Sequence, residues 1–369
     1  MARCLKRPIG LCTPQNGKGR IRYDRRRPEG GQKMHTALLW DVEGERIRCH
    51  LCPNRCLISR GGVGVCGVRS VDAAGTLIAV TYGRVSSIAV DPIEKKPVFH
   101  YFPGASVLSL GSVGCSMRCG HCQNWSIARA TPEDGETRFL EPVSVVEMAR
   151  NYRCPGVAFT YNEPVIWAEY VLDVARLCRE AGLFTVMVTN GYITPEGLDL
   201  LGEVIDVWRV DLKGSRDETY RKLCHVPAVQ PVMDAAVRAR HHWGMHVEVV
   251  TNVVPTMNDS HDELTEMAEF IAGSLGVDTP WHVTRFFPYL DFAHLEPTPI
   301  ETLQLARTIG RNAGLHFVYL GNIDEPGGED TVCPVCGTVA IRRSGYTILD
   351  KGTREGACAR CGTALNVIE

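Results

Sequence analysis

The strongest constraint on the fold is a regular alternation of short apolar runs with longer amphipathic segments between residues 105 and 320. Amphipathic segments that predict helices lie at 165–181, 264–275 and 300–313. The apolar, β-branched runs that predict strands are 107–110, 157–160, 185–189, 204–210, 247–252, 282–286 and 317–320. Strand, helix, strand at this spacing predicts βαβ units and a parallel sheet. We therefore expect an α/β fold, a full or partial (β/α) TIM-like barrel whose chemistry collects at the carboxyl ends of the strands.

A group of three cysteines follows the first expected strand. Cys115, Cys119 and Cys122 are spaced Cys-x3-Cys-x2-Cys in a loop that contains glycine. Three thiolates can surround one metal centre, but a structural site closes its coordination sphere with four ligands. On a four-iron cluster, three thiolates leave one iron free for an exogenous ligand. A zinc knuckle completed by His121 and a closed electron-transfer cluster are the two alternatives.

A second cysteine group lies near the end of the sequence. Two Cys-x2-Cys pairs, each followed by glycine, are formed by Cys333, Cys336, Cys358 and Cys361. Four thiolates close a tetrahedron, so a structural zinc site is the leading interpretation and a rubredoxin-like iron is the lesser one.

A third cysteine group lies before the barrel. It consists of Cys49, Cys52 and Cys56, with Cys66 ten residues later in a glycine-rich run. Four thiolates suit zinc and an auxiliary four-iron cluster alike, so the sequence leaves both open.

Cysteine is unusually frequent, with 16 residues in the chain. Short-spaced groups suit metal chelation better than disulfides, and they indicate a reducing, cytoplasmic setting. The scattered residues Cys4, Cys12, Cys154, Cys178 and Cys224 are expected to be inert and small. The formal net charge of −2 makes a nucleic-acid partner unlikely by charge. No apolar stretch approaches the roughly 18 residues of a membrane-spanning helix, so no membrane association is expected.

The patterns divide the chain into four expected parts. Residues 1–33 are rich in Lys and Arg without apolar periodicity, which predicts a disordered basic extension, or a mis-assigned start with Met34 as the true one. Residues 34–104 form a Cys-rich module and residues 105–325 the barrel. Residues 326–369 form a zinc-ribbon-like module, too short to hold a good core without a metal.

The central motif, placed directly after the first strand, resembles the signature of radical S-adenosylmethionine (SAM) enzymes. The resemblance implies a 4Fe-4S cluster held by Cys115, Cys119 and Cys122, with SAM on the open iron. It further implies reductive cleavage of SAM to a 5′-deoxyadenosyl radical for hydrogen abstraction, with an electron donor such as flavodoxin or ferredoxin. His121 stands where the family usually has an aromatic residue.

The same resemblance implies cofactor contacts at the ends of later strands. Glu163 matches the carboxylate of the family's Gly-Gly-Glu-Pro turn, while Tyr161 and Asn162 replace both glycines. The implied cofactor-binding residues are Asn162, Glu163, Asn190, Asp211 and His282. A plain turn at Asn190, a helix cap at Asp211 and an ordinary core histidine at His282 are the alternatives.

The likeness extends over most of the chain. Segments 49–56, 82–87 and 91–97, with Gly321-Asn322, resemble the AmmeMemoRadiSam radical SAM enzymes, which are related to pyruvate formate-lyase activating enzyme. This implies Memo-like and AMMECR-like proteins as partners, and it leaves open whether the substrate is a small molecule or a protein. We expect hydrogen abstraction from an unidentified substrate. A glycyl-radical-enzyme activase is one alternative, and a non-enzymatic, metal-stapled interaction protein is an alternative of another class.

The charged and aromatic segment 91–101 lies just before the first barrel strand. Such a run usually forms a solvated loop. Near the mouth of a cluster site, Glu94, Lys95, Lys96 and His100 could instead gate the site or shape a substrate pocket.

Overall fold

An eight-stranded sheet forms the centre of the molecule. The computed structural model describes residues 34–134 and 136–369, so the expected basic extension 1–33 lies outside the described residues. The sheet order is β15-β14-β13-β12-β11-β10-β8-β7, and β7 (Ser87–Pro92) is antiparallel to β8. The parallel strands are β8 (Ser106–Gly111), β10 (Gly156–Phe159), β11 (Phe184–Thr189), β12 (Val207–Asp211), β13 (His246–Val253), β14 (Trp281–Arg285) and β15 (Val318–Gly321).

The parallel strands coincide with the seven strands predicted from the apolar runs, with boundaries shifted by a few residues. Their side chains are almost all buried, as expected for a parallel sheet covered by helices. The sheet order ends at β7 and β15, which do not pair with each other, so the fold is the partial rather than the closed barrel. The antiparallel edge strand β7 was not predicted, because its sequence was assigned to the segment before the barrel.

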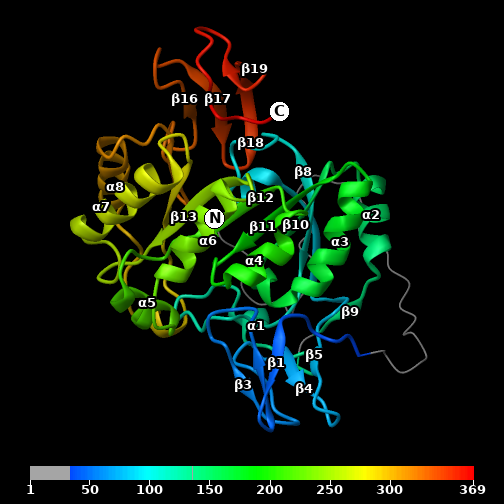
Figure 1. Cartoon of the computed structure of the whole chain (residues 1–369). Coiled ribbons are helices and arrows are strands. Elements are labelled where there is room, and N and C mark those ends of the chain that lie inside the picture. The colour runs from blue at the N-terminus through cyan, green and yellow to red at the C-terminus, as the bar shows by residue number, and fades with distance from the viewer. Residues whose placement is uncertain (1–33, 135) are drawn as a thin grey trace.

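Helices connect the strands and cover the sheet, as Figure 1 shows for α3, α4 and α6. The predicted helices at 165–181 and 300–313 are confirmed, and the one at 264–275 divides into α7 and a π turn. The helices are α1 (Trp125–Ala128), α2 (Pro142–Asn151), α3 (Ala168–Glu180), α4 (Pro195–Gly202), α5 (Asp217–Cys224), α6 (Gln230–His241), α7 (His261–Phe270) and α8 (Ile300–Asn312). Short turns are η1 (Ile93–Lys95), η2 (Pro164–Trp167), η3 (Ile271–Leu275) and η4 (Leu290–Phe292).

Local sequence signals fix where some of these helices start. The hydroxyl of Thr194 accepts a hydrogen bond from the backbone N–H of Gly197, and Pro195 fills the first position of α4. Ser260 caps α7 in the same way through the N–H of Glu263. Both caps satisfy N–H groups that have no partner within the helix, so they set the register of the buried face.

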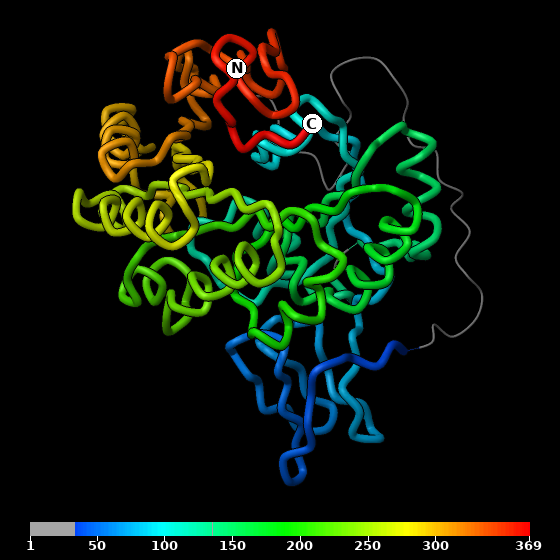
Figure 2. Tube along the Cα trace, turned by 45° about the horizontal axis from the view of Figure 1, so that its top comes forward, coloured from blue at the N-terminus to red at the C-terminus, as the bar shows by residue number. Residues whose placement is uncertain are grey.

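The cysteine-rich segment before the barrel lies at one end of the molecule, drawn in blue in Figures 1 and 2. A fully buried ion pair between Arg69 and Glu169 of α3, with N···O of 2.7 Å, holds it against the barrel. Its short strands are β1 (Trp40–Glu43), β2 (Arg46–Cys49), β3 (Leu57–Ile58), β4 (Arg69–Val71), β5 (Leu77–Ala79) and β6 (Arg84–Val85), the last paired with β9 (Arg138–Phe139).

The segment after the barrel lies at the opposite end, drawn in red in Figures 1 and 2. It packs on Phe99, Phe317 and Tyr319 through a small core of its own. The guanidinium of Arg343 lies 4.2 Å from the centre of the Phe99 ring and donates to the Phe99 carbonyl. Its strands are β16 (Thr331–Val332), β17 (Val339–Ser344), β18 (Thr347–Lys351), β19 (Thr353–Arg354) and β20 (Ala357–Cys358).

The interpretation of residues 91–101 as a solvated loop is wrong. Asp91, Glu94, Lys96 and His100 are all buried. Lys96 forms a 2.6 Å ion pair with Asp91, and the imidazole of His100 hydrogen-bonds to Tyr319 Oη at 2.6 Å. The end of the chain covers part of this segment, because Arg343 donates to the carbonyl of Phe99 and the imidazole of His100 hydrogen-bonds to the carbonyl of Leu365.

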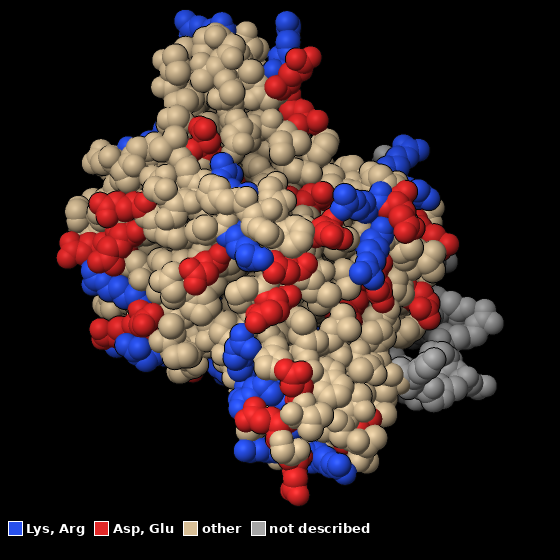
Figure 3. Space-filling model, in the orientation of Figure 1, with Lys and Arg blue, Asp and Glu red and all other residues tan. Residues whose placement is uncertain are grey.

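Two properties of the surface bear on possible partners. Figure 3 shows acidic and basic side chains interspersed over the visible face, without a continuous patch of one sign. Within the described residues, no helix combines the length and the apolar character needed to cross a lipid bilayer.

Candidate active site

The carboxyl ends of the parallel strands open into one large cavity of about 970 Å³. Parallel strands direct the loops that follow them to the same edge of the sheet, which is why residues distant in sequence meet here. All eight residues predicted for the central cluster and its cofactor line this cavity, namely Cys115, Cys119, Cys122, Asn162, Glu163, Asn190, Asp211 and His282.

The three cysteines come from the loop between β8 and α1. Backbone bonds from Arg118 N–H to the Cys224 carbonyl and from Gly120 N–H to the Leu223 carbonyl anchor this loop to the end of α5. Gly114 has φ of +86°, and a Cβ there would lie 2.6 Å from the carbonyl oxygen of Cys66. Glycine is therefore required at this position by both backbone conformation and space.

The environments of the three thiols differ. Burial raises the pKa of Cys115 well above its ordinary value. A hydrogen bond with the thiol of Cys224 lowers the pKa of Cys119. Cys224 was interpreted from the sequence as an inert, scattered thiol, and the structure places it against the central group. No spacing signal could have revealed this, because the contact is made across the fold.

Glu163 lies at the end of β10 and is fully buried. Its carboxylate accepts hydrogen bonds from the backbone N–H of Val165, the hydroxyl of Thr189 and the backbone N–H of Asn190, at 2.6 to 2.9 Å. Burial raises the pKa of this carboxyl to about 7 although these bonds oppose the shift. The carboxylate thus links β10 to the end of β11 and retains acceptor capacity toward the cavity.

Two asparagines hold the loops around the thiols. The side-chain amide of Asn190 lies 3.7 Å from the Sγ of Cys115 and 3.2 Å from the Oγ of Ser116. Asn162 accepts from the backbone N–H of Ser112 and donates to the carbonyl of Gly114, at 2.9 and 3.1 Å. Both side chains therefore position the cysteine loop as well as lining the cavity.

Tyr161, which stands where the family's turn has a glycine, adopts a backbone conformation typical of glycine. Its φ is +76°, in the left-handed region that glycine adopts without strain. Its hydroxyl donates to Asp91 Oδ2 at 2.6 Å, and the Nζ of Lys96 lies 4.9 Å from its ring centre. The buried side chains of Asp91 and Lys96 therefore support the turn that precedes Glu163.

Asp211, at the end of β12, is flanked by two cations. It pairs with Arg209 and with Lys213, whose Nζ lies 3.0 Å from Oδ2. Burial alone would raise the pKa of Asp211, but Arg209 and Lys213 hold it below its ordinary value. Lys213 keeps its positive charge for the same reason, since the attraction of Asp211 outweighs burial and raises its pKa. The group leaves a cationic side chain facing the cavity.

His282 lies deeper in the barrel than the strand ends. Its Nε2 is 2.6 Å from Oε2 of the buried Glu248, and its ring stacks on Tyr319. Burial lowers the pKa of His282 although Glu248 opposes the shift. The imidazole lines the cavity, and its Nε2 is bonded to a core carboxylate. The predicted cofactor contact of His282 stays a prediction.

The donor set around the cavity fits an iron–sulfur cluster with an anionic, amine-bearing ligand. Three thiols from one loop face the cavity, and carboxylate, amide and ammonium groups surround them. The Nδ1 of His121 is buried at the cavity wall without a hydrogen-bond partner in the described part of the chain. Burial lowers the pKa of His121 to about 3, so the ring is neutral at physiological pH.

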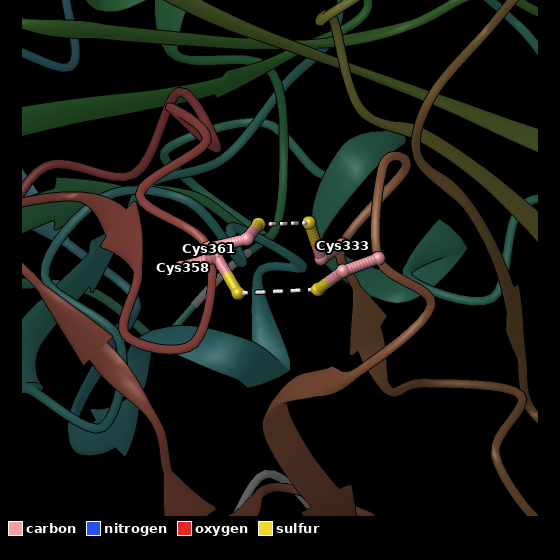
Figure 4. A group of neighbouring side chains, drawn as sticks. Cys333, Cys358 and Cys361 are labelled. Atoms are coloured by element: carbon pink, nitrogen blue, oxygen red, sulfur yellow. Dashed lines mark hydrogen bonds between the residues drawn. The ribbon is translucent and has the colours of Figure 1, made fainter.

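The four cysteines of the last segment form a compact group at the far end from α1, and Figure 4 shows their thiols facing each other in pairs. The Sγ atoms of Cys333 and Cys361 are 3.5 Å apart, those of Cys336 and Cys358 are 3.7 Å apart, and all four lie within 4.8 Å of one another. Hydrogen bonding to Thr338 lowers the pKa of Cys336 to about 6, which favours the thiolate that a metal requires. The geometry is that of a site for a single ion.

The four cysteines before the barrel lie apart from both other groups in sequence but next to the central loop in space. Cys49, Cys52, Cys56 and Cys66 line one small interior cavity together with Arg69. They do not form a set with all ligand atoms within 4.8 Å of one another.

An open parallel sheet with thiols, carboxylates and amines gathered in one cavity at its strand ends is the arrangement of an α/β enzyme. The profile of the radical SAM superfamily matches residues 110–271. An uncharacterized protein of Methanocaldococcus jannaschii is 39% identical over 338 residues, which span 91% of this chain and 100% of that protein. The chain belongs to the radical SAM superfamily and is an enzyme, and that family uses a 4Fe-4S cluster, SAM and a reductant.

Activating enzymes are among the other relatives. The pyruvate formate-lyase-activating enzyme of Clostridium pasteurianum is 26% identical over 183 residues, which span 48% of this chain and 75% of that enzyme. A solved domain of the pyruvate-formate lyase-activating enzyme from Bacteroides vulgatus superposes with a TM-score of 0.39 at 20% identity, covering 45% of this chain and 99% of that domain. The expected relationship to glycyl-radical activases is thereby confirmed at the level of homology.

Proposed function

We propose that Cys115, Cys119 and Cys122 hold the 4Fe-4S cluster and that SAM binds beside it in the cavity at the strand ends. When bound, the reduced cluster and SAM supply a 5′-deoxyadenosyl radical, which abstracts hydrogen from a substrate that is not identified. The observation that carries the proposal is the convergence of the three thiols with Asn162, Glu163, Asn190 and Asp211 on one cavity.

Different residues of the cavity would contact the ammonium and the carboxylate groups of SAM. The carboxylate of Glu163 keeps a free acceptor position for an ammonium group, and its raised pKa makes that capacity depend on pH. Lys213, which lines the same cavity, offers a cation for a carboxylate. The amide of Asn190 fixes Cys115 relative to both.

The size and lining of the cavity support a second molecule beside SAM. Ligand cavities span about 300 to 1,000 Å³, and this one lies at the upper end. It is also lined by polar side chains outside the predicted cofactor set, including Asn252 and Arg285. This composition favours a polar substrate.

We prefer a small molecule or a thin peptide segment as substrate over a folded glycyl-radical enzyme. Gly345 and Tyr346, in the turn between β17 and β18, line the cavity. This turn leaves less room for a folded protein to enter from the side of the last segment. The activase function is the second candidate, favoured by the similarity to activating enzymes. Memo-like and AMMECR-like proteins as partners, a flavodoxin or ferredoxin as electron donor, and a cytoplasmic location complete the proposal.

The cysteines of the last segment are proposed to hold structural zinc. A tetrahedral zinc with Zn–S bonds of about 2.3 Å places its sulfurs about 3.8 Å apart. The Sγ–Sγ separations of 3.5 and 3.7 Å fit that edge. Iron in the same four-thiolate site is the alternative, and metal analysis distinguishes the two.

The experiment for the central proposal is anaerobic reconstitution with iron and sulfide, followed by reduction and an assay for 5′-deoxyadenosine. Cys115→Ser, Cys119→Ser and Cys122→Ser are each expected to abolish the product, while Cys154→Ser, a buried cysteine outside all three groups, is expected to leave it unchanged. Unchanged product in all three variants of the central group would refute the assignment.

A further inference from the structure

The cysteine quartet before the barrel differs in its geometry from the last one. Cys49, Cys52 and Cys66 are buried, Cys56 is half-buried, and all four line the same interior cavity. None of these four cysteines lines the cavity of the central cysteines.

The spacing of the thiols separates the two quartets. In the last segment, all four sulfurs lie within 4.8 Å of one another, as one shared ion requires. Among Cys49, Cys52, Cys56 and Cys66, no three sulfurs meet that limit, and the same is true of Cys115, Cys119 and Cys122. Thiolates that bind different irons of a cluster are farther apart than thiolates that share one ion. The wider spread around a cavity therefore favours a polynuclear centre.

The wall of the quartet's cavity contains a donor that lacks an acceptor. Arg69 is 2% exposed and lines the cavity, and its Nε has no hydrogen-bond partner in the described chain. Its Nη2 is occupied by both oxygens of Glu169, at 2.7 Å each. An unsatisfied buried guanidinium N–H costs free energy, and a thiolate or sulfide in the cavity would accept from it. The backbone N–H of Val65 already donates to the Sγ of Cys56 at 3.4 Å.

The quartet also lies against the loop of the central cysteines. Asn54, between Cys52 and Cys56 in sequence, donates its side-chain amide to the carbonyl of Ser116 at 2.8 Å. The guanidinium of Arg118 donates to the carbonyl of Val65, also at 2.8 Å. On the same side, Gly114 leaves just enough room for the carbonyl of Cys66. Two metal centres held by these loops would be neighbours.

We infer that Cys49, Cys52, Cys56 and Cys66 hold a second iron–sulfur cluster, closed by four thiolates, which passes single electrons to the cluster of the central cysteines. Each cleavage of SAM consumes one electron. A low-potential donor of the ferredoxin or flavodoxin class would reduce the second cluster, which is reoxidised as the first is reduced. The relay role rests on the proposed function, whereas the metal site does not.

The site is tested in a variant that lacks the catalytic cluster altogether. The full chain with Cys115→Ala, Cys119→Ala and Cys122→Ala is reconstituted anaerobically and analysed for iron, sulfide and zinc. We expect about four iron and four sulfide per chain, with the electron paramagnetic resonance signal of a reduced four-iron cluster. Zinc in place of iron at the quartet would overturn the inference. Adding Cys56→Ser, the least buried of the four, should remove the signal, and adding Cys154→Ser should not.

The relay is tested by counting electrons in the wild-type enzyme. The protein is fully reduced, freed of reductant and then mixed with SAM. Two clusters store two electrons, so we expect about two 5′-deoxyadenosine per chain, against about one in Cys56→Ser. A yield of one in the wild type would overturn the relay. A wild type that makes no product would refute the proposed function, while the iron content of the triple variant would still decide the second site.

Discussion

The hydroxyl of Tyr161 donates a 2.6 Å hydrogen bond to the carboxylate of Asp91, which ties the turn after β10 to the edge strand β7. Tyr161 has φ of +76°, a conformation that costs a non-glycine residue on the order of 1 to 3 kcal/mol. Asp91 is in turn held by Lys96 at 2.6 Å. The side-chain contacts therefore sustain a backbone shape that the related turns obtain from glycine.

The hydrogen bond between Tyr161 and Asp91 predicts how the loss of the Tyr161 hydroxyl affects stability and SAM binding. Tyr161→Phe should lower the free energy of unfolding by about 1 to 3 kcal/mol, because Asp91 loses a buried donor. It should also weaken SAM binding, since the turn leads directly into Glu163. Denaturant titration and equilibrium binding of SAM check both effects. Tyr346→Phe, an exposed tyrosine on the same cavity, is the control that should change neither.

The affinity for SAM should depend on pH through Glu163. Its pKa of about 7 means that the carboxylate form increases as pH rises, and only that form attracts an ammonium group. Between pH 6 and 7.5 we expect binding to tighten about eightfold, following the ionised fraction. Glu163→Gln should bind more weakly and lose the dependence. Glu329→Gln changes another carboxyl of the cavity whose pKa burial raises to about 7, and it should retain the dependence.

Cys224 should tune the catalytic cluster without holding it. Its thiol hydrogen-bonds with Cys119, and its burial raises its own pKa well above the ordinary value. Cys224→Ala should leave the iron content unchanged and shift the reduction potential to a more negative value, because a hydrogen bond to a ligand sulfur is lost. Redox titration monitored by electron paramagnetic resonance measures the shift. A loss of about four iron per chain would instead identify Cys224 as a ligand.

Removal of one thiol from the last quartet should unfold that segment locally. Cys336→Ser is expected to release about one zinc per chain. It should also lower the free energy of local opening, seen by amide hydrogen exchange, by several kcal/mol, because so small a unit depends on metal binding for its folding free energy. Hydrogen exchange at the amide of the buried Ile341 reports the loss. Amides of β11, in the barrel, should keep their protection. Equal loss of protection in β11 would contradict a local role for the metal.

The sequence predicted the barrel strands because parallel strands that are buried on both faces have short, continuous apolar sequences. The runs at 107–110 and 247–252 became β8 and β13 with limits shifted by a few residues at most. It could not predict that Asp91, Glu94, Lys96 and His100 are buried. Charged residues such as Asp91 and Lys96 are solvated by default, and only their pairing inside the fold makes burial possible.

Chain order and spacing determined the three cysteine groups and the strand ends at which polar residues would meet. The class of cofactor chemistry was implied by the resemblance of the central motif to radical SAM enzymes. Tertiary structure decided the geometry between these groups: which thiols lie close enough to share one ion, that Cys224 touches Cys119, and that Arg69 faces the first quartet with an N–H that has no partner in the described chain. Spacing fixes which ligands are local, because a short loop can bring them together. Distances between separate loops depend on how helices and strands pack, and no local pattern encodes them.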